Sequence, residues 1–427
     1  MKIIDVRNFD KIPSGELARP VFDTRSLELT VSDILQQVKE KGDEAVKQFT
    51  LQFDKTSLER TKVSAWEIEE AVSKLSPELK SAIREAKSNI ELFHGQQFEK
   101  PAPVTTMPGV TCWRKTVAIE KVGLYIPGGT APLFSTLLML GIPAKIAGCR
   151  EIVLCSPPDS EGRLHPAILY AAQQVGITKI FKIGGVQAIA AMAYGTATVP
   201  KVYKIFGPGN QYVTCAKQLV QKDGLAIDMP AGPSEVAVYA DLTANPVFAA
   251  ADLLSQAEHG ADSQVVLVSP FSGMVEDILA AVDEQLALLP RAAVARLALE
   301  NSRAFLVKDD QQAMELLNEY APEHLILACK NPEELAAKVV NAGSVFLGHY
   351  SPESVGDYAS GTNHVLPTNG YARAYSGVSV DSFVKKITFQ QLTKEGIRQI
   401  GRAVELMAEA EGLEAHANAV RVRMAGA

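Results

Sequence analysis

The chain has 427 residues, of which 47% are hydrophobic and 21% charged, and it carries a net charge of −7 with a pI near 5.7. This ordinary globular composition excludes a disordered or fibrous protein, and at roughly 150 residues per domain the length predicts two to four compact units. The acidic balance argues against a nucleic-acid partner, which would need a basic surface, and favours a small molecule.

The cysteines and the amino terminus indicate a reducing compartment. No C-x-x-C spacing occurs, so neither a disulfide framework nor a thiolate zinc site is expected. The start "MKIIDVRNFDKIPSG" lacks a signal-peptide core, and no run reaches the roughly 18 apolar residues that span a bilayer. We therefore expect a cytoplasmic protein without membrane contact. The five cysteines are Cys112, Cys149, Cys155, Cys215 and Cys329.

The first hundred residues have the pattern of helices. Ser64 and Glu67 in "SAWE" form a capping box, and Ser76 in "SPEL" is an N-cap followed by proline at the first helical position. The helix that begins there should stop near Gly95. We expect residues 1–115 to be a helical region that packs on the second of two α/β units.

Strands and helices alternate after Val117, which predicts parallel sheets covered by helices. Residues 116–232 form the expected first unit, with strand-like runs "VAIEKVGLYIP", "EIVLCSPP", "TKIFKIGG" and "KVYKIFGPGN" and helical segments "PAILYAAQQVG" and "VQAIAAMAYG". The alternation resumes in residues 233–375 with "SEVAVYAD", "QVVLVSP", "HLILAC" and "GSVFLG" and with helices near 246–258, 271–300, 310–319 and 332–341. The fold class is therefore α/β with two Rossmann-like parallel-sheet domains, joined near "MPAGPSEV".

Residues 376–427 form a predicted helical tail. The segment Thr388 to Ala427 has the pattern of two helices broken at "AEGLEAH". This is too little chain for a core of its own, so it must pack on something else, for which a second subunit is one candidate.

Four of the seven histidines stand beside other polar side chains, whereas His94, His165 and His349 have the context of structural residues. In "ADLLSQAEHGAD", Gln256 and His259 are three residues apart and share one helix face. They are either half of a divalent cation site or a polar helix end, and two ligands alone would leave a cation undersatisfied.

Asp357 in "SVGDYASGTNH" and His416 in the tail are candidates for the missing ligands. A carboxylate among small loop residues can approach an ion, although an Asx turn is the more common reading of Asp357 by itself. Such a mixed nitrogen and oxygen set suits zinc and would also accept manganese or cobalt.

Glu323 and His324 in "APEHL" precede a strand, in a loop that could face a crevice. One carboxylate and one imidazole can serve two different proton transfers, which suits a two-step reaction. Surface polarity before a strand is the more common reading of such a pair.

Glycine and proline gather at strand ends in "YIPGGTAP", "KIGGVQA" and "FGPGNQYV". None fits G-x-G-x-x-G, so the dinucleotide fingerprint is missing. The carboxyl ends of parallel strands are nevertheless the usual ligand position, and small residues there let a cofactor approach the backbone. Tight turns without a ligand explain the motifs equally well.

The strings "GLYIPGG", "FGPGN", "DMPAGPSEV", "DLLSQAEHG", "PEHL" and "GDYASGTNHVLPT" together resemble the histidinol dehydrogenase family, in order from about residue 20 to the tail. The resemblance implies an aldehyde-dehydrogenase-like pair of domains. It also implies a zinc enzyme that completes histidine biosynthesis by oxidising L-histidinol to L-histidine through L-histidinaldehyde, with two NAD+ consumed per turnover.

The same resemblance assigns site residues by position. Glu323 and His324 would be the acid–base pair, and one zinc ion per subunit would be held by Gln256, His259, Asp357 and His416. The substrate would contact this metal set and His324, together with Ser234, His364 and Glu411. NAD+ would contact Tyr125, Gln187 and Asn210. The family forms homodimers with exchanged tails, so that Glu411 and His416 would complete the partner's site.

In this chemistry His324 is the base that removes the alcohol proton, and Glu323 activates the water that hydrates the aldehyde. A thiohemiacetal on Cys149 or Cys155 is a rival route that their apolar context disfavours. Two other functions compete with the dehydrogenase. One is a zinc hydrolase with Glu323 as general base, and the other is a nucleotide-binding sensor, which would give the ligand set no role.

Overall fold

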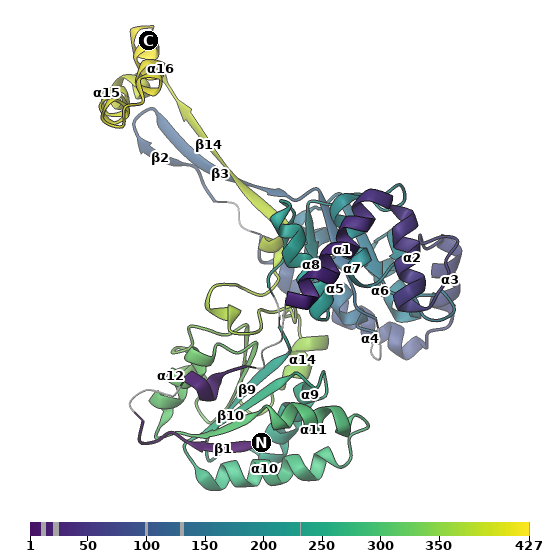
Figure 1. Ribbon diagram of the computed structural model, residues 1–427. Coiled ribbons are helices and arrows are strands. Elements are labelled where there is room, and N and C mark those ends of the chain that lie inside the picture. Colours follow the sequence, from purple (N-terminus) through teal and green to yellow (C-terminus); the bar gives the residue numbers. More distant parts are fainter. Residues whose placement is uncertain (10–13, 20–24, 99–100, 129–131, 231, 427) are drawn as a thin grey trace.

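The computed structural model describes residues 1–9, 14–19, 25–98, 101–128, 132–230 and 232–426. Two α/β units lie against each other, and a long arm projects from the first unit and ends in two helices (Figure 1). Within these ranges no helix combines the length and the apolar character needed to cross a membrane.

The first unit is built on a parallel sheet of five strands in the order β6-β5-β4-β7-β8. The chain starts in the middle at β4, moves outward to β6, and then crosses to β7 on the other side. This doubly wound path leaves a topological switch point between β4 and β7. The strands are β4 (Lys121–Tyr125), β5 (Glu151–Ser156), β6 (Lys179–Lys182), β7 (Lys204–Phe206) and β8 (Ala226–Ile227). Its helices are α5 (Phe134–Ala147), α6 (Pro166–Val175), α7 (Gly185–Tyr194) and α8 (Gln211–Lys222).

The second unit repeats this path in a parallel sheet ordered β1-β11-β10-β9-β12-β13, with β9 as the first central strand. The prediction of two Rossmann-like parallel sheets is confirmed. The strands are β1 (Lys2–Asp5), β9 (Glu235–Ala240), β10 (Gln264–Ser269), β11 (Arg303–Leu306), β12 (His324–Ala328) and β13 (Ser344–Leu347). The helices are α9 (Pro246–Ala257), α10 (Ser272–Leu286), α11 (Ala292–Glu300), α12 (Asp310–Tyr320), α13 (Pro332–Ala336) and α14 (Glu353–Tyr358). Short 3₁₀ turns lie at Ser14–Leu17, Tyr371–Arg373 and Val380–Phe383.

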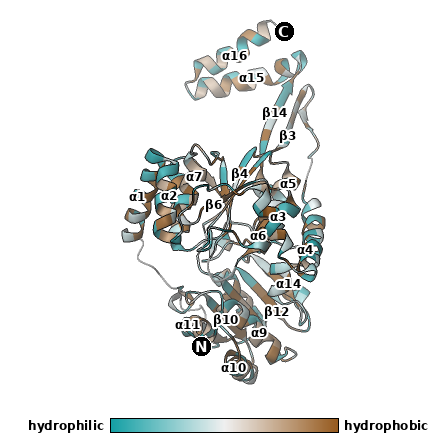
Figure 2. Cartoon of the chain, turned by 90° about the vertical axis from the view of Figure 1, so that its right-hand side faces the viewer, coloured by the Kyte–Doolittle hydropathy of each residue, from teal (hydrophilic) through white to brown (hydrophobic). Residues whose placement is uncertain are grey.

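The amino-terminal helices pack on the first unit, so the prediction that they pack on the second is wrong. Helix α1 contacts α7 and α8, α2 contacts α7, α3 contacts α6, and α4 contacts α5, and both views place α1 and α2 beside α7 (Figures 1 and 2). The apolar stripes of α1 and α2 share one core with α7, and those of α3 and α4 share a second core with α5 and α6, which decides the packing. Among the described residues of this region, β1 is the strand that pairs with the second sheet, beside β11. The helices are α1 (Arg25–Lys41), α2 (Asp43–Asp54), α3 (Ala65–Ser73) and α4 (Pro77–Gly95).

The predicted helix caps in this region are confirmed. The Ser64 side chain accepts a hydrogen bond from the Glu67 backbone N–H while Glu67 reaches back to Ser64, and Ser76 caps α4, which ends at Gly95. Residues 104–118 are not helical, however, because they form the strands β2 (Val104–Met107) and β3 (Val110–Ala118).

The arm consists of β2, β3 and β14 (Val384–Leu392), followed by α15 (Lys394–Ala410) and α16 (Glu414–Ala425). The helix predicted from Thr388 is wrong up to Leu392, because this stretch pairs antiparallel with β3 and stacks the ring of Phe389 on Trp113. The predicted break between the two helices is present at Gly412, whose φ is 73°.

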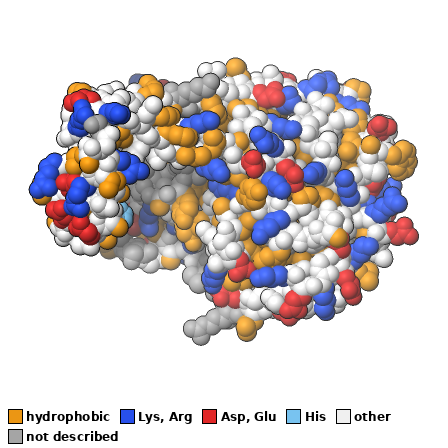
Figure 3. All heavy atoms as spheres, turned by 90° about the horizontal axis from the view of Figure 1, so that it is seen from above, with side chains coloured by type: hydrophobic (Ala, Val, Ile, Leu, Met, Phe, Trp, Pro, Cys, Tyr) orange, Lys and Arg blue, Asp and Glu red, His pale blue; other side chains and the backbone are white. Residues whose placement is uncertain are grey.

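Helices α15 and α16 pack on each other at the far end of the arm, and hydrophilic and hydrophobic residues are mixed along both of them (Figure 2). Arg421 forms ion pairs with Glu409 and Glu414, and the view from above shows acidic and basic side chains side by side on these helices (Figure 3). Several large apolar side chains of the arm are exposed in the single chain: Ile387, Phe389, Leu406, Met407, Leu413 and Val422.

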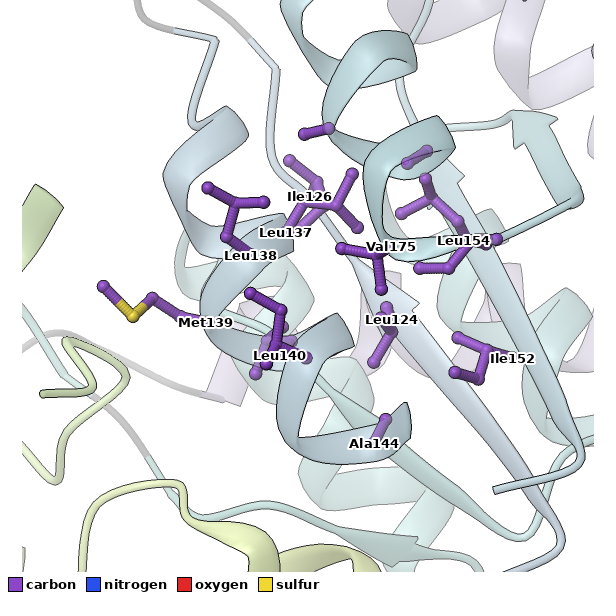
Figure 4. Packing of buried hydrophobic residues seen from close by; sticks show 14 of the residues in the cluster. Leu124, Ile126, Leu137, Leu138, Met139, Leu140, Ala144, Ile152, Leu154 and Val175 are labelled. Carbon is purple, nitrogen blue, oxygen red and sulfur yellow. The ribbon is translucent and has the colours of Figure 1, made fainter. Parts of the chain in front are cut away.

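The core of the first unit forms where α5 is enclosed by the sheet, α4 and α6 (Figure 4). Helix α5 is apolar all round, as expected for a helix that is buried on every side. Gly141 lets α6 approach closely, because an added Cβ would lie 2.9 Å from a methyl group of Val175. This rigid base supports the strand ends that face the second unit.

Candidate active site

A cleft of about 1430 Å³ separates the two units and is lined by residues of both. The first unit contributes the carboxyl ends of its strands, and the second contributes residues at the amino ends of its strands. Seven of the residues singled out from the sequence line this cleft: Tyr125, Gln187, Asn210, Ser234, His259, Glu323 and His364.

On the first-unit side the glycine-rich motifs bring backbone segments into direct contact. Tyr125 ends β4, and its hydroxyl accepts a hydrogen bond of 3.1 Å from the Gly185 N–H at the start of α7. Gly207 follows β7 with a φ of 130°, and a Cβ there would lie 2.0 Å from the Tyr125 carbonyl oxygen. Only glycine fits this position, so the motif has a structural reason at the switch point.

Two further predicted cofactor contacts lie in the first turns of helices. Asn210 caps α8, because its Oδ1 accepts hydrogen bonds of 3.1 Å from the backbone N–H groups of Tyr212 and Val213. Gln187 in α7 is fully buried, and its Oε1 has no hydrogen-bond partner among the described residues. A buried amide oxygen without a partner is costly, so this position fits a hydrogen-bond donor of a bound ligand.

A buried ion pair that the sequence analysis missed holds the Gly207 turn. Lys217 on α8 pairs with Asp228 after β8, and both side chains are almost fully buried. Lys217 Nζ donates to the Gly207 carbonyl over 2.8 Å, and the Gly207 N–H donates to Asp228 Oδ2 over 2.8 Å. A lysine on the apolar face of an amphipathic helix was the only signal in the sequence.

On the second-unit side, Glu323 and His324 are 7% and 3% exposed, so the reading as surface polarity is wrong. His324 is the first residue of β12, which lies between β9 and β13. Glu323 Oε2 accepts a hydrogen bond of 2.9 Å from the Glu235 backbone N–H at the start of β9. The two side chains are thus held by strand pairing rather than by a loop.

The imidazole of His324 is placed by three neighbours. Nδ1 lies 3.1 Å from the Glu235 carbonyl oxygen and 3.2 Å from Gln256 Nε2. Because a carbonyl oxygen only accepts, this contact places the ring proton on Nδ1, and the Gln256 amide beside it then donates to the same Glu235 carbonyl oxygen over 3.1 Å rather than to the ring. Nε2 has no hydrogen-bond partner, lies 3.4 Å from Asp357 Oδ1, and is the atom left to exchange a proton.

Gln256 and Asp357 converge on the His324 ring from two helices. Gln256 lies in the last turn of α9 and is 1% exposed, while Asp357 lies near the end of the short helix α14 rather than in a loop as predicted. Gln256 Oε1 and Asp357 Oδ1 are both buried without a hydrogen-bond partner among the described residues. Two unpartnered oxygens from an amide and a carboxylate fit a cation.

His259 follows α9, and its backbone N–H donates to the Gln256 carbonyl over 3.2 Å, so the helical spacing of the two residues is kept. Its side chain lines the cleft. Among the described residues, no three His, Cys, Asp or Glu side chains of this chain converge on a metal position. The donors that do come together, Gln256, His259 and Asp357, therefore fit an incomplete site.

Glu411 and His416 do not join them within one chain. Both are exposed on the helices at the end of the arm, far from the cleft (Figure 1). Gly412 separates the helices that carry them, as predicted. Of the four predicted metal residues, the single chain thus brings three to one region and leaves His416 apart.

His364 and Ser234 complete the cleft wall. His364 Nδ1 lies 2.7 Å from the Asp357 carbonyl oxygen, and Nε2 lies 2.9 Å from the Thr136 hydroxyl of α5. His364 therefore connects the second unit to the first. Ser234 is partly exposed directly before β9.

Burial and mutual charge shift the proton affinities in this cluster. Burial raises the pKa of Glu323 to about 8. Burial disfavours the charged form of His324 and by itself would lower its pKa. The neighbouring carboxylates of Glu323, Glu353 and Asp357 outweigh this effect and raise the pKa of the imidazole above its usual value. Burial would raise the pKa of Asp357, yet His324 and the other histidines hold it below its usual value. Adjacent groups with separated pKa values are typical of sites that transfer protons.

The thiols do not suit a covalent route. Burial raises the pKa of Cys149 to about 12, and it raises the pKa of Cys155 further. Neither thiol is among the residues that line the cleft. Since the thiolate is the nucleophile, the thiohemiacetal alternative has no support in the geometry.

Two doubly wound units that face one cleft, with glycine-lined strand ends on one side and a buried histidine–carboxylate cluster on the other, define a two-domain α/β enzyme. Residues 17–424 match the family model described as histidinol dehydrogenase, and the chain belongs to this family of oxidoreductases.

Relatives that carry this family name are similar in sequence to the chain over nearly its full length. The chain is 62% identical over 419 residues to histidinol dehydrogenase of Bacteroides thetaiotaomicron, covering 97% of this chain and 98% of that protein. It is 54% identical over 411 residues to that of Escherichia coli strain K12, covering 96% and 94%. The crystal structure of histidinol dehydrogenase from Elizabethkingia anophelis superposes with a TM-score of 0.97 at 53% identity, covering 100% of this chain and 98% of the other.

Proposed function

We propose that this protein oxidises L-histidinol to L-histidine through L-histidinaldehyde, using zinc and NAD+, as a cytoplasmic homodimer. The observation that carries the proposal is the buried Glu323–His324 pair beside the unpartnered oxygens of Gln256 and Asp357. This cluster lies across the cleft from the glycine-lined strand ends of the first unit.

Zinc would be held by Gln256, His259 and Asp357 of one chain and His416 of a second copy. The mixed oxygen and nitrogen donors suit a borderline metal of this kind. When bound there, zinc supplies a Lewis acid that orients and polarises an imidazole-bearing alcohol. His364, Ser234 and the arm residue Glu411 are the proposed further contacts of the substrate.

NAD+ would occupy the first-unit side, against Tyr125, Gln187 and Asn210. When bound, it supplies the hydride acceptor for each of two oxidations. The glycine turn at Gly207 leaves backbone accessible at the switch point, where dinucleotides bind in doubly wound sheets.

In the first oxidation His324 acts as the base. The carbinol carbon loses a hydride, the hydroxyl proton moves to His324 Nε2, and the remaining electron pair forms the aldehyde C=O bond. The Glu235 carbonyl supports this role because it keeps the other ring proton on Nδ1. The imidazole can then accept a proton only on the side that faces Asp357.

In the second oxidation Glu323 acts on water. Its carboxylate removes a proton as the water oxygen adds to the aldehyde carbon, and the former carbonyl oxygen takes up the proton that His324 gained in the first step, which yields a neutral gem-diol. Loss of a second hydride to NAD+ and of one hydroxyl proton from the diol then forms the carboxylic acid, which releases its remaining acidic proton to become the carboxylate product. Glu323 is suited to this step because it lines the cleft, and because burial raises its pKa to about 8, which makes its carboxylate a stronger base than an exposed one.

The proposed homodimer would place the arm of each subunit on the other. The exposed apolar side chains of the arm, among them Leu406 and Met407, support this because such a surface is normally covered. Exchange would bring Glu411 and His416 to the partner's cleft, as the incomplete ligand set requires.

The decisive experiment is to follow the absorbance of reduced nicotinamide with histidinol and NAD+. We expect two NADH per histidinol consumed, whereas a zinc hydrolase or a nucleotide sensor would produce none. Truncation after Lys394 removes only α15 and α16, so the two sheets should remain folded while zinc binding and turnover are lost. An active truncated monomer would refute the exchanged site.

A further inference from the structure

Asp54 is an acidic residue of the cleft that comes from outside the sheet. It is the last residue of α2, and its side chain is half-buried in the cleft wall with Tyr125 and Gln187. Gln187 Nε2 donates to Asp54 Oδ2 over 3.5 Å. A Cβ added to Gly184 would lie 3.3 Å from Asp54 Oδ1, so the carboxylate sits against the start of α7.

This carboxylate has no cationic partner among the described residues. The adjacent Lys55 points elsewhere, because its Nζ donates to the Gln52 carbonyl over 2.8 Å. Burial raises the pKa of Asp54 to about 6. The negative end of the helix dipole also disfavours a carboxylate at the end of α2. The position therefore costs stability, and among the described residues only the long hydrogen bond from Gln187 offsets this cost.

The neighbouring Gln187 amide indicates which kind of ligand fits beside Asp54. Gln187 is fully buried with its Nε2 directed to Asp54, and its Oε1 has no partner among the described residues. The pair therefore presents a free carboxylate and a free amide oxygen, which are acceptors only. A ligand that satisfies both must donate hydrogen bonds, as a diol does.

We propose that Asp54 binds the hydroxyls of an unphosphorylated ribose and thereby makes the cleft select NAD+ over NADP+. The inference rests on the proposed use of NAD+. A carboxylate accepts hydrogen bonds from a ribose diol and repels a 2′-phosphate, and partial burial of Asp54 reduces the screening of this repulsion by water.

In a typical doubly wound unit the acidic residue that binds ribose follows the second strand. Here the second strand is β5, and the acidic residue after it is Asp159. Asp159 is exposed, and its Oδ1 already accepts hydrogen bonds of 2.9 Å from the backbone N–H groups of Glu161 and Arg163. Because Asp159 closes its own turn, the half-buried Asp54 is the better candidate.

The test compares kcat/KM for NAD+ and NADP+ in the wild-type dimer, Asp54→Asn and the control Glu44→Gln. Asparagine can still accept the bond from Gln187, so the substitution removes only the charge. We expect the NAD+/NADP+ preference of Asp54→Asn to fall about 10- to 100-fold through KM, as for loss of a hydrogen bond to a charged group. Glu44 is exposed at the other end of α2 and outside the cleft, so Glu44→Gln should keep the wild-type preference.

A thermal melt adds an independent readout. Asp54→Asn should unfold at the same or a higher temperature than wild type, because an unpaired charge at a helix end is removed. A lower melting temperature with an unchanged preference would assign Asp54 a structural role and overturn the inference. A shift in preference in Asp159→Asn but not in Asp54→Asn would overturn it too. Wild-type protein that reduces neither dinucleotide would instead refute the proposed function, and this inference with it.

Discussion

The first unit presents the carboxyl ends of its strands to the cleft, whereas the second unit presents the amino ends. Tyr125 is the last residue of β4, but His324 is the first residue of β12. Both units have the same doubly wound strand order. The same strand order therefore presents opposite ends of the strands to one cleft.

The strand ends that the two units present to the cleft offer different chemistry. At the carboxyl ends of the first sheet, helix starts and glycine turns expose backbone groups, which suits the binding of a large ligand. At the amino ends of the second sheet, strand pairing holds side chains rigidly, as the bond from the Glu235 N–H to Glu323 shows. In the proposed mechanism, backbone recognition and side-chain proton transfer therefore belong to different units.

The carboxyl ends of the strands in the second sheet, which do not line the cleft, support this division. Its switch point lies between β9 and β12, where Asp241 accepts hydrogen bonds from the backbone N–H groups of Thr243 and Lys330. The carboxylate closes a turn there, and none of these residues lines the cleft. The second unit has the geometry for a ligand site at this end and fills it with its own contacts.

The largest effect should come from Glu323→Gln, which tests whether the second unit alone carries the chemistry. Without the carboxylate, water is not activated, and aldehyde oxidation should slow by about 10²- to 10⁴-fold. The alcohol step, measured as a single-turnover burst of one NADH, should change far less, since His324 remains. Equal loss of both steps would assign the two residues to one inseparable function.

A smaller effect is expected for Lys217→Met, which disturbs the first unit only. Removing one partner of the buried Lys217–Asp228 pair should lower the free energy of unfolding by about 3–5 kcal/mol, because an unpaired charge stays buried. KM for NAD+ should rise while zinc content is unchanged, since the Gly207 turn loses a bond.

The double variant Lys217→Met/Asp228→Asn is the matched control for this pair. It removes the uncompensated charge and should recover part of the lost stability. If the double variant is less stable than Lys217→Met alone, the pair does not act through its charges.

The smallest effect concerns Glu353, a buried carboxyl behind the second-unit site that accepts a hydrogen bond of 3.2 Å from Ser255. Burial raises its pKa to about 8, above the unfolded value of 4.5. The protonated form is favoured in the fold, so its contribution to stability is full below about pH 4.5 and is lost as pH rises through 8.

Glu353→Gln should therefore flatten the decline of stability between pH 5 and pH 8.5, by an amount on the order of 2 kcal/mol, measured by urea unfolding. The exposed Glu276→Gln on α10 serves as control and should keep the wild-type pH dependence. Parallel curves for wild type and Glu353→Gln would contradict the raised pKa.

Much of this arrangement could be predicted from local patterns. The alternation of strands and helices predicted both sheets, and the spacing of Gln256 and His259 predicted that they share one helix end. The Ser64 and Ser76 caps were also readable, because a cap depends on residues three positions apart. The substrate and the site roles came from the resemblance of long motifs rather than from spacing.

Other features could not be predicted, since they depend on partners far away in the chain. Thr388–Leu392 has a helix-compatible composition, but pairing with β3 makes it a strand. The helices of the amino-terminal region have apolar stripes that fit either unit, and only the cores shared with α5, α6 and α7 decide which. Lys217 and Asp54 carry no motif at all.

The sequence by itself therefore determined the two α/β units, the local caps and the family, because these depend on periodicity and on contiguous residues. Only the tertiary structure decided that the strands of the two units meet the cleft with opposite ends, and that Glu323 and His324 are buried. The reason is physical: burial, strand pairing and charge proximity depend on contacts between residues hundreds of positions apart, as between Arg19 and Glu235, and no local pattern encodes them.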